Sequence, residues 1–127
     1  MKSSFKLEDS FPLFNKKCNY IFKSLINFKF DTTNEVERKD IDLKIIKNII
    51  NNLDKMPNLK FFIFKVICRN IDEITYKKFI EELLLLNIKN IELSINNNMT
   101  EYSKDELKDI YKGIDFDNFE KIIIKKI

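Results

Sequence analysis

The sequence predicts an α/β fold in which four parallel strands alternate with helices. Four short apolar segments recur with their starts roughly thirty residues apart, a spacing typical of stacked β–α units. Helix-like stretches lie between them, and strands joined through helices run parallel with right-handed crossovers. No linker or shift of composition divides the 127 residues, so we expect one domain. It would comprise an N-terminal helical cap over residues 1–24 and β–α repeat units over residues 25–127.

The first expected helix covers residues 10–24. Its apolar residues recur at three- and four-residue spacings and therefore share one side of the helix. Ser10 is a suitable N-cap, and Pro12 stands in the first turn, where its missing N–H needs no partner. Residues 25–30 then predict a strand, which Asp31 and its turn-forming neighbours end.

The second helix is expected over residues 40–55, where isoleucines and leucines form a stripe along one side. Pro57 ends it, because a proline disfavours a helical conformation in the residue before it. Residues 59–67 follow and are aromatic, β-branched and almost continuously apolar. This composition is typical of a strand buried within a parallel sheet.

Capping signals mark the third helix. Asn70 supplies a side-chain acceptor and Glu73 follows three residues later, a relative of the capping box that predicts a helix start. The apolar side of this helix runs to Leu86. A strand over residues 88–95 comes next.

The fourth helix has the clearest local signals in the chain. Ser103 and Glu106 match the capping box, and Tyr102 can pack against the first turns of the helix. Gly113 lies where this helix would end, since glycine readily adopts the left-handed conformation common there. Residues 119–127 predict the last strand.

The strand segments share a pattern whose clearest copy is Ile88, Ile91, Leu93 and Asn96. This pattern resembles the long, helix-containing leucine-rich repeats of the ribonuclease-inhibitor-like type. The resemblance implies a short solenoid in which the three apolar side chains point into the core and the asparagine binds the backbone of the turn. An unrelated compact parallel α/β fold is the alternative. The other copies lack the asparagine, because its equivalents are Thr33, Ile67 and Ile127.

In such a curved array, helices cover one face of the sheet and the opposite face stays open. The residues between the pattern positions would then face solvent. They are Lys60, Phe61, Ile63, Lys65 and Val66, then Lys89, Asn90, Glu92, Ser94 and Ile95, and finally Glu120, Lys121, Ile123, Lys125 and Lys126. An exposed apolar patch rimmed by charge is typical of an interaction surface. The competing interpretation is that these residues are core, because the first helix folds across that face.

We therefore predict a non-catalytic protein–protein interaction module that uses the open face. The residues expected to contact the partner are Lys60, Phe61, Ile63, Lys65, Lys89, Glu92, Ile95, Lys121, Ile123 and Lys125. The alternative is a nucleic-acid-binding domain with a lysine-rich sheet face on which Phe61 stacks against a base. A net charge of +3 gives that alternative little support. A homodimer through the C-terminal edge strand is a further prediction, since an unpaired edge invites strand pairing.

Catalysis gains little support from the sequence, and no cofactor or metal is expected. The chain has no histidine, so it lacks the usual general base at neutral pH. A single glycine excludes a glycine-rich phosphate loop, and two cysteines without histidine do not form a zinc site. Paired carboxylates remain the one enzymatic option. These are Asp40 with Asp42, Glu81 with Glu82, and Asp115 with Asp117.

Composition also bears on the source and compartment. Abundant Ile, Lys, Asn and Phe indicate an AT-rich genome, so lysine counts carry little functional weight. The two cysteines are expected to be free thiols in a reducing compartment. No apolar run has the length of a transmembrane helix or of a signal peptide. We expect a cytoplasmic protein, located in the host cytoplasm if its source is a virus, that does not bind a membrane.

Overall fold

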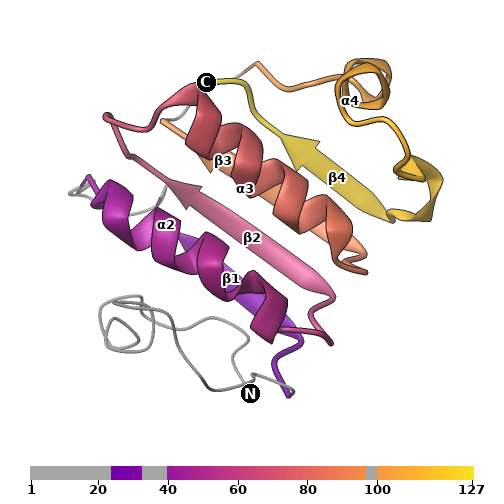
Figure 1. The fold of residues 1–127 in the computed structure, drawn as a ribbon, viewed down its shortest axis with the longest axis horizontal. Helices are drawn as coiled ribbons and strands as arrows, with labels where there is room; N and C mark the ends of the chain where they lie inside the picture. Colours follow the sequence, from indigo (N-terminus) through magenta and orange to yellow (C-terminus); the bar gives the residue numbers. More distant parts are fainter. Residues whose placement is uncertain (1–23, 33–39, 97–99) are drawn as a thin grey trace.

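The computed structural model describes residues 24–32, 40–96 and 100–127 of the chain. Strands and helices alternate along it (Figure 1). The elements in order are β1 (Asn27–Asp31), α2 (Leu43–Asn52), the 3₁₀ turn η1 (Leu53–Lys55), β2 (Phe61–Val66), α3 (Glu73–Leu85), β3 (Asn90–Ile95), α4 (Lys104–Ile110), the 3₁₀ turn η2 (Phe116–Asn118) and β4 (Lys121–Ile124). Apart from Ser24, the expected N-terminal cap lies outside the described residues.

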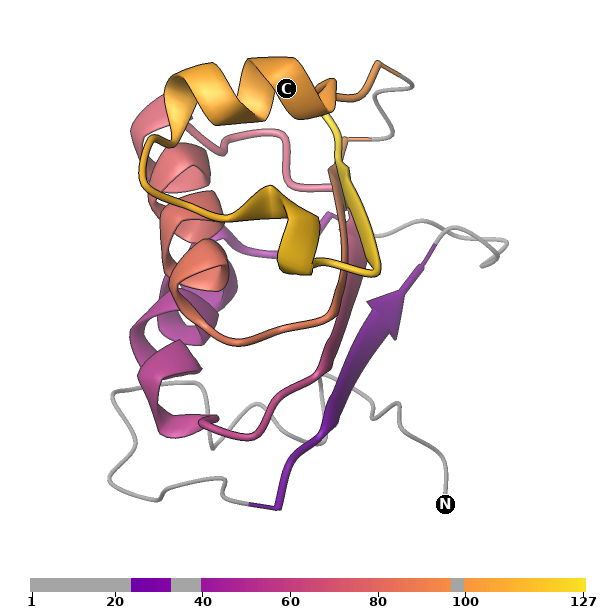
Figure 2. The same cartoon turned by 90° about the vertical axis from the view of Figure 1, so that its right-hand side faces the viewer.

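The four strands form one sheet in the order β1-β2-β3-β4, and every neighbouring pair is parallel. The predicted α/β class and the predicted four-stranded parallel sheet are therefore confirmed. Helices α2 and α3 lie on one side of this sheet, and α4 lies at its β4 end (Figures 1 and 2). Among the described residues, none of the helices is both long enough and apolar enough to cross a membrane.

The core lies between the sheet and the helices and is dominated by phenylalanine. Phe28, Phe62 and Phe64 are fully buried and occupy adjacent positions on β1 and β2. The rings of Phe28 and Phe62 stack with centroids 4.9 Å apart. Phe79 of α3 meets Phe62 and Phe64 edge-on, at 5.7 Å from each. Such aromatic pairs contribute roughly 0.5–1.5 kcal/mol each beyond the area that they bury.

Two parallel rows of side chains extend this core across the sheet. The first row contains Phe28, Phe62, Ile91 and Ile122, and the second contains Phe30, Phe64, Leu93 and Ile124. The row members on β2 and β3 are fully buried, whereas Phe30 and Ile122 on the edge strands are partly exposed. The sheet is thus best covered in its middle.

The capping signals were predicted correctly for α4 and incorrectly for α3. The Ser103 hydroxyl accepts a hydrogen bond from the Glu106 amide, and the Glu106 carboxylate accepts one from the Ser103 amide. For α3 the N-cap is Asp72, which accepts from the Thr75 amide, and not Asn70. Asn70 is engaged elsewhere, because its side-chain oxygen accepts from the Cys68 thiol.

Gly113 has the positive backbone angle that its position predicts, with φ at 90°. It lies three residues beyond the end of α4, in the turn that leads to η2 and β4. The last strand is shorter than the segment 119–127, because Lys125 forms an isolated antiparallel bridge with Glu101 instead.

Candidate functional site

Side chains that alternate with the core positions form the outer face of the sheet, opposite α2 and α3 (Figure 2). We use the term outer face for these residues of the four strands. They are Asn27, Lys29 and Asp31 on β1, Phe61, Ile63 and Lys65 on β2, Asn90, Glu92 and Ser94 on β3, and Lys121 and Ile123 on β4. The sheet register places Lys29, Ile63, Glu92 and Ile123 in one row across it.

Six of the ten predicted contact residues lie on this face. These are Phe61, Ile63, Lys65, Glu92, Lys121 and Ile123. Phe61 is 40% exposed, whereas Ile63 and Ile123 are partly buried. The face therefore combines an exposed aromatic ring with isoleucines and charged groups, as the sequence predicts.

Three other predicted residues lie at the ends of the strands. Lys60 and Lys89 precede β2 and β3, and both are partly buried. Their carbonyl oxygens accept hydrogen bonds from the amides of Asn90 and Lys121, which start the neighbouring strands. Lys125 follows β4, and its ammonium lies 4.0 Å from the Glu101 carboxylate. These lysines border the outer face rather than occupy its centre.

The prediction that Ile95 and Val66 face solvent is wrong. Ile95 is fully buried, Val66 is 1% exposed, and the two residues are register partners in the core. The reason is the two-residue period of a strand. Ile95 lies two residues beyond Leu93 and must point to the same side, and Val66 has the same relation to Phe64.

Lys126 was also expected on the open face and lies elsewhere. Its ammonium is 2.8 Å from the Glu106 carboxylate and 5.4 Å from the centre of the Tyr102 ring. Glu106 is in the first turn of α4, and Tyr102 directly precedes the N-cap of this helix. This ion pair and the capping contacts hold the pKa of the Glu106 carboxyl below its ordinary value.

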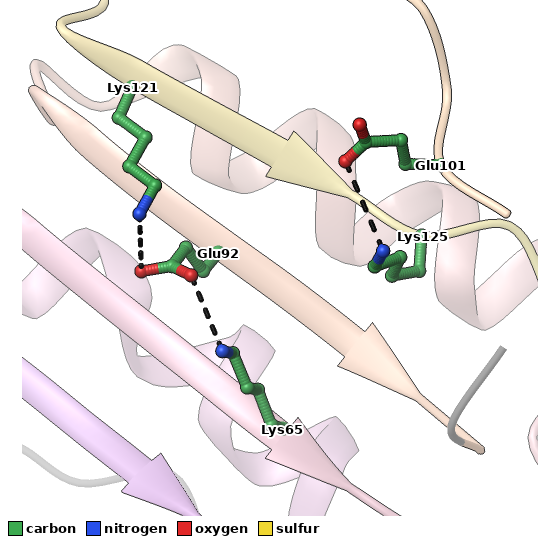
Figure 3. A network of polar contacts seen from close by, with 5 residues as sticks. All are labelled: Lys65, Glu92, Glu101, Lys121 and Lys125. Carbon is green, nitrogen blue, oxygen red and sulfur yellow. Dashed lines mark ion pairs between the residues drawn. The ribbon is translucent and has the colours of Figure 1, made fainter. Parts of the chain in front are cut away.

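A three-residue ion network occupies the middle of the outer face (Figure 3). The Glu92 carboxylate lies 3.3 Å from the Lys65 ammonium on one side and 3.5 Å from the Lys121 ammonium on the other. Glu92 is 15% exposed, compared with 31% for Lys65 and 51% for Lys121. The carboxylate is thus recessed, and the two ammonium groups stand further into solvent. The sequence alone did not reveal this network, because its members meet only through the register of three strands.

Asn96 makes the contact that the resemblance to leucine-rich repeats implies for it. It has a left-handed backbone, with φ at 70°, directly after β3. Its side-chain oxygen accepts a 2.8 Å hydrogen bond from the amide of Cys68, in the turn after β2. Its own amide donates to the carbonyl of Val66. The side chain therefore ties together the ends of two neighbouring strands.

Thr32 performs a related task that sequence reasoning missed. It is buried directly after β1, and both its amide and its hydroxyl donate to the carbonyl of Lys65 at 3.0 and 3.2 Å. The expected equivalent, Thr33, lies outside the described residues. Cys68 is a free, buried thiol, and burial raises its pKa. The other cysteine, Cys18, also falls outside the described range.

Two of the three carboxylate pairs have structural partners. Asp42 caps α2 by accepting from the Lys44 amide, and Asp40 pairs with Arg69 at 3.3 Å. Asp115 caps η2, and Asp117 pairs with Lys104 at 2.8 Å. Glu81 and Glu82 are consecutive residues of α3, so their side chains point in different directions. Within residues 24–32, 40–96 and 100–127, no cluster of three or more carboxylate or thiol side chains could hold a metal ion.

A groove of about 250 Å³ lies between α3 and α4, away from the outer face. The apolar and aromatic part of its lining comprises Tyr76, Ile80, Tyr102, Ile110, Tyr111 and Ile127. The Tyr76 phenol donates to the Lys125 carbonyl, and burial raises its pKa well above the ordinary value. Burial likewise raises the pKa of Tyr111 to about 12. Both phenols are therefore neutral at physiological pH, and neither is activated as a nucleophile.

The outer edge of β4 is partly occupied by the chain itself. The Tyr102 amide donates to the Ile124 carbonyl, and the Lys126 amide donates to the Thr100 carbonyl, both at 2.9 Å. These bonds pair the carboxyl end of β4 with residues 100–102. A dimer through this strand stays a prediction, and it would have to use the part of the edge before Ile124.

Comparisons with known proteins supply no relative. No family model, curated protein or solved structure matches the chain.

Proposed function

We propose that the protein is a non-catalytic, leucine-rich-repeat-like protein-binding module that holds its partner on the outer face of the sheet. The observation that carries this proposal is the composition of that face. Phe61 is 40% exposed, Ile63 and Ile123 are partly buried on either side of Glu92, and Lys29, Lys65 and Lys121 lie on the same face. An exposed aromatic ring among apolar and charged side chains is typical of a protein interface, in which aromatic residues supply much of the binding energy.

Two features of the fold support the repeat-like part of the proposal. Ile88, Ile91 and Leu93 are buried in the core, each with at most 2% of its surface exposed. Asn96 binds the backbone of the preceding strand's turn. In addition, α2 and α3 lie on the same side of the sheet, so neither of them covers the outer face.

Nucleic-acid binding is the second candidate, and the lysines of the outer face favour it. Lys29 and Lys121 are exposed there, and Phe61 is available for stacking on a base. Glu92 does not separate the two candidates, because its carboxylate engages both Lys65 and Lys121 and would repel a phosphate and a partner's carboxylate alike. Ile63 and Ile123 favour a protein, because a phosphate backbone makes no use of them.

Site-specific photo-crosslinking in native cells tests the proposal. A photoreactive phenylalanine analogue would replace Phe61 on the outer face or, as the control, Leu85 on α3, which is 72% exposed. We expect a discrete adduct from position 61 that a protease degrades and a nuclease does not, and little adduct from position 85. Substituting Ile63→Ser in the same chain should weaken the adduct.

Two results would contradict the proposal. Equal crosslinking from both positions would mean that the outer face has no preferred role. An adduct at position 61 that nuclease removes would favour the nucleic-acid candidate instead.

A further inference from the structure

The charges of the outer face are unequal in exposure as well as in number. Its lysines are Lys29, Lys65 and Lys121, and its carboxylates are Asp31 and Glu92. At its border Lys125 pairs with Glu101, and the Glu120 carboxylate accepts a hydrogen bond from Asn90. Glu92 is less exposed than either lysine that it binds. On β1, Asp31 is partly buried whereas Lys29 is exposed. At the centre of this face the ammonium groups are therefore more exposed than the carboxylates.

Lys65 and Lys121 converge on one carboxylate from two different strands (Figure 3). A lysine ammonium has three N–H donors, and the contact with Glu92 does not use them all. A second carboxylate, brought by a ligand, can bind the remaining donors of both lysines. Glu92 would compete with that ligand carboxylate and repel it, so Glu92 lowers the affinity for acidic ligands.

Apolar groups lie beside this pair of lysines. Ile63 and Ile123 flank Glu92 in the same row across the sheet, and Phe61 lies two residues before Ile63 on the same face of β2. Neighbouring strands are about 4.8 Å apart, so one short peptide can reach the lysines and the isoleucines together. A phosphate backbone makes no use of the isoleucines, which favours a polypeptide over a nucleic acid.

We infer that the partner presents an acidic polypeptide segment whose carboxylates bind between Lys65 and Lys121 while its apolar side chains contact Ile63 and Ile123. This inference rests on the proposed function and adds the chemistry of the partner. It predicts that removing the charge of Glu92 raises the affinity for an acidic ligand and that removing the charge of either lysine lowers it, because Glu92 repels such a ligand whereas the lysines attract it.

The test measures binding of short fluorescent peptides to the full chain by anisotropy. In the acidic probe every second residue is glutamate or leucine, with serine between them, so that both kinds of side chain face the sheet in an extended peptide. A matched probe replaces each glutamate with lysine, and a labelled oligothymidylate serves as the nucleic-acid probe. We expect the acidic probe to bind most tightly and to weaken as salt is added.

Variants then give the sign of each contribution. Glu92→Gln should tighten binding of the acidic probe roughly three- to tenfold, and Lys65→Gln or Lys121→Gln should weaken it by a similar factor. Ile123→Ser should weaken the acidic probe as well. Lys78→Gln, an exposed lysine on α3, is the matched control and should leave binding unchanged. Circular dichroism establishes that each variant is folded.

Three results would overturn the inference. They are tighter binding of the lysine probe, weaker or unchanged binding of the acidic probe by the Glu92→Gln variant, and tight binding of oligothymidylate that Ile123→Ser does not affect. The crosslinking experiment shows whether only the acidic partner is wrong or whether the proposed protein-binding function is wrong as well. A basic or uncharged segment crosslinked to position 61 refutes only the acidic partner, whereas no protein adduct at position 61 refutes the binding module itself.

Discussion

Phe61 and Phe62 are neighbours in the sequence and lie in opposite environments. Phe62 is fully buried, stacks on Phe28 and meets Phe79 edge-on. Phe61 is 40% exposed and lies in register with Asn27 and Asn90. The same contrast separates the whole inner face of the sheet from the outer face. Residue type alone therefore does not decide the role of a side chain here; its position in the two-residue period of the strand does.

The largest expected effect tests this contrast directly. Phe62→Ala should lower the free energy of unfolding by about 3–5 kcal/mol, because it leaves a cavity among packed rings. Phe61→Ala should change it by less than about 1 kcal/mol, since the side chain is already exposed. Urea unfolding followed by circular dichroism measures both. If Phe62→Ala does not fold, Phe62→Leu should still lose more stability than Phe61→Ala. Equal losses at the two positions would contradict the contrast between the faces.

The next largest loss of stability is expected at Asn96, which directly follows β3 and begins the turn. Asn96→Ala should lower the free energy of unfolding by about 2–3 kcal/mol. It removes the acceptor of the Cys68 amide, and it replaces asparagine, which tolerates the left-handed region, with alanine, which does so less well. Asn96→Gly removes the same acceptor without the backbone strain and should lose less stability. If alanine and glycine were equally destabilising in urea unfolding, strain would not contribute at this turn.

A third experiment uses pH to examine a polar group on the helix side. Tyr76→Phe should lower the free energy of unfolding by about 1 kcal/mol at neutral pH, because the Lys125 carbonyl loses its donor. Burial raises the pKa of Tyr76 above its ordinary value of 10.0, so the folded state retains the proton that the unfolded state releases. The stabilisation is therefore complete below about pH 10 and is lost as pH rises further.

Tyr111, a second tyrosine with a raised pKa, provides a comparison for the pH dependence expected of Tyr76. Wild-type stability should fall above pH 10, and Tyr76→Phe should flatten that fall. Tyr111→Phe should flatten it similarly up to about pH 12 but not at higher pH, because the pKa of Tyr111 is raised to about 12. Chemical unfolding at a series of alkaline pH values measures both slopes. A Tyr76→Phe variant with the wild-type slope would show that the buried phenol does not control alkaline stability.

The smallest effect is expected on the outer face. Glu92→Gln removes the charge that Lys65 and Lys121 share and should lower the free energy of unfolding by about 0.5–1 kcal/mol at low salt. The difference from wild type should shrink in concentrated salt, because exposed ion pairs are screened. A loss as large as that of Phe62→Ala would mean that the network, rather than the phenylalanine core, holds the sheet together.

Local signals allowed much of the fold to be predicted from the sequence. Ser103 and Glu106 contact each other across a single helical turn, so their spacing alone predicts the start of α4. The same logic failed at α3, where Asn70 and Asp72 are both suitable caps. The choice between them depends on Cys68, which binds Asn70 and belongs to the turn after β2.

The outer face was only partly predictable, for two physical reasons. The repeat pattern predicts Ile95 on the outer face, whereas the two-residue period of the strand puts it on the same side as Leu93, in the core. The Glu92 network depends on register between strands that are separated by whole helices. The pattern within each segment does not give the register between strands, so the network can be identified only from the three-dimensional structure.

The parallel arrangement has a kinetic consequence. Every strand pairing in this sheet joins segments roughly thirty residues apart, so the chain must close a long loop before any pairing contributes stability. We expect refolding on the millisecond-to-second timescale, slower than in helical bundles of similar size. β2 and β3 each have a neighbour on both sides, and α3 connects them. Closure of that middle loop, with Phe79 docking on Phe62 and Phe64, is the natural nucleus from which β1 and β4 can then add.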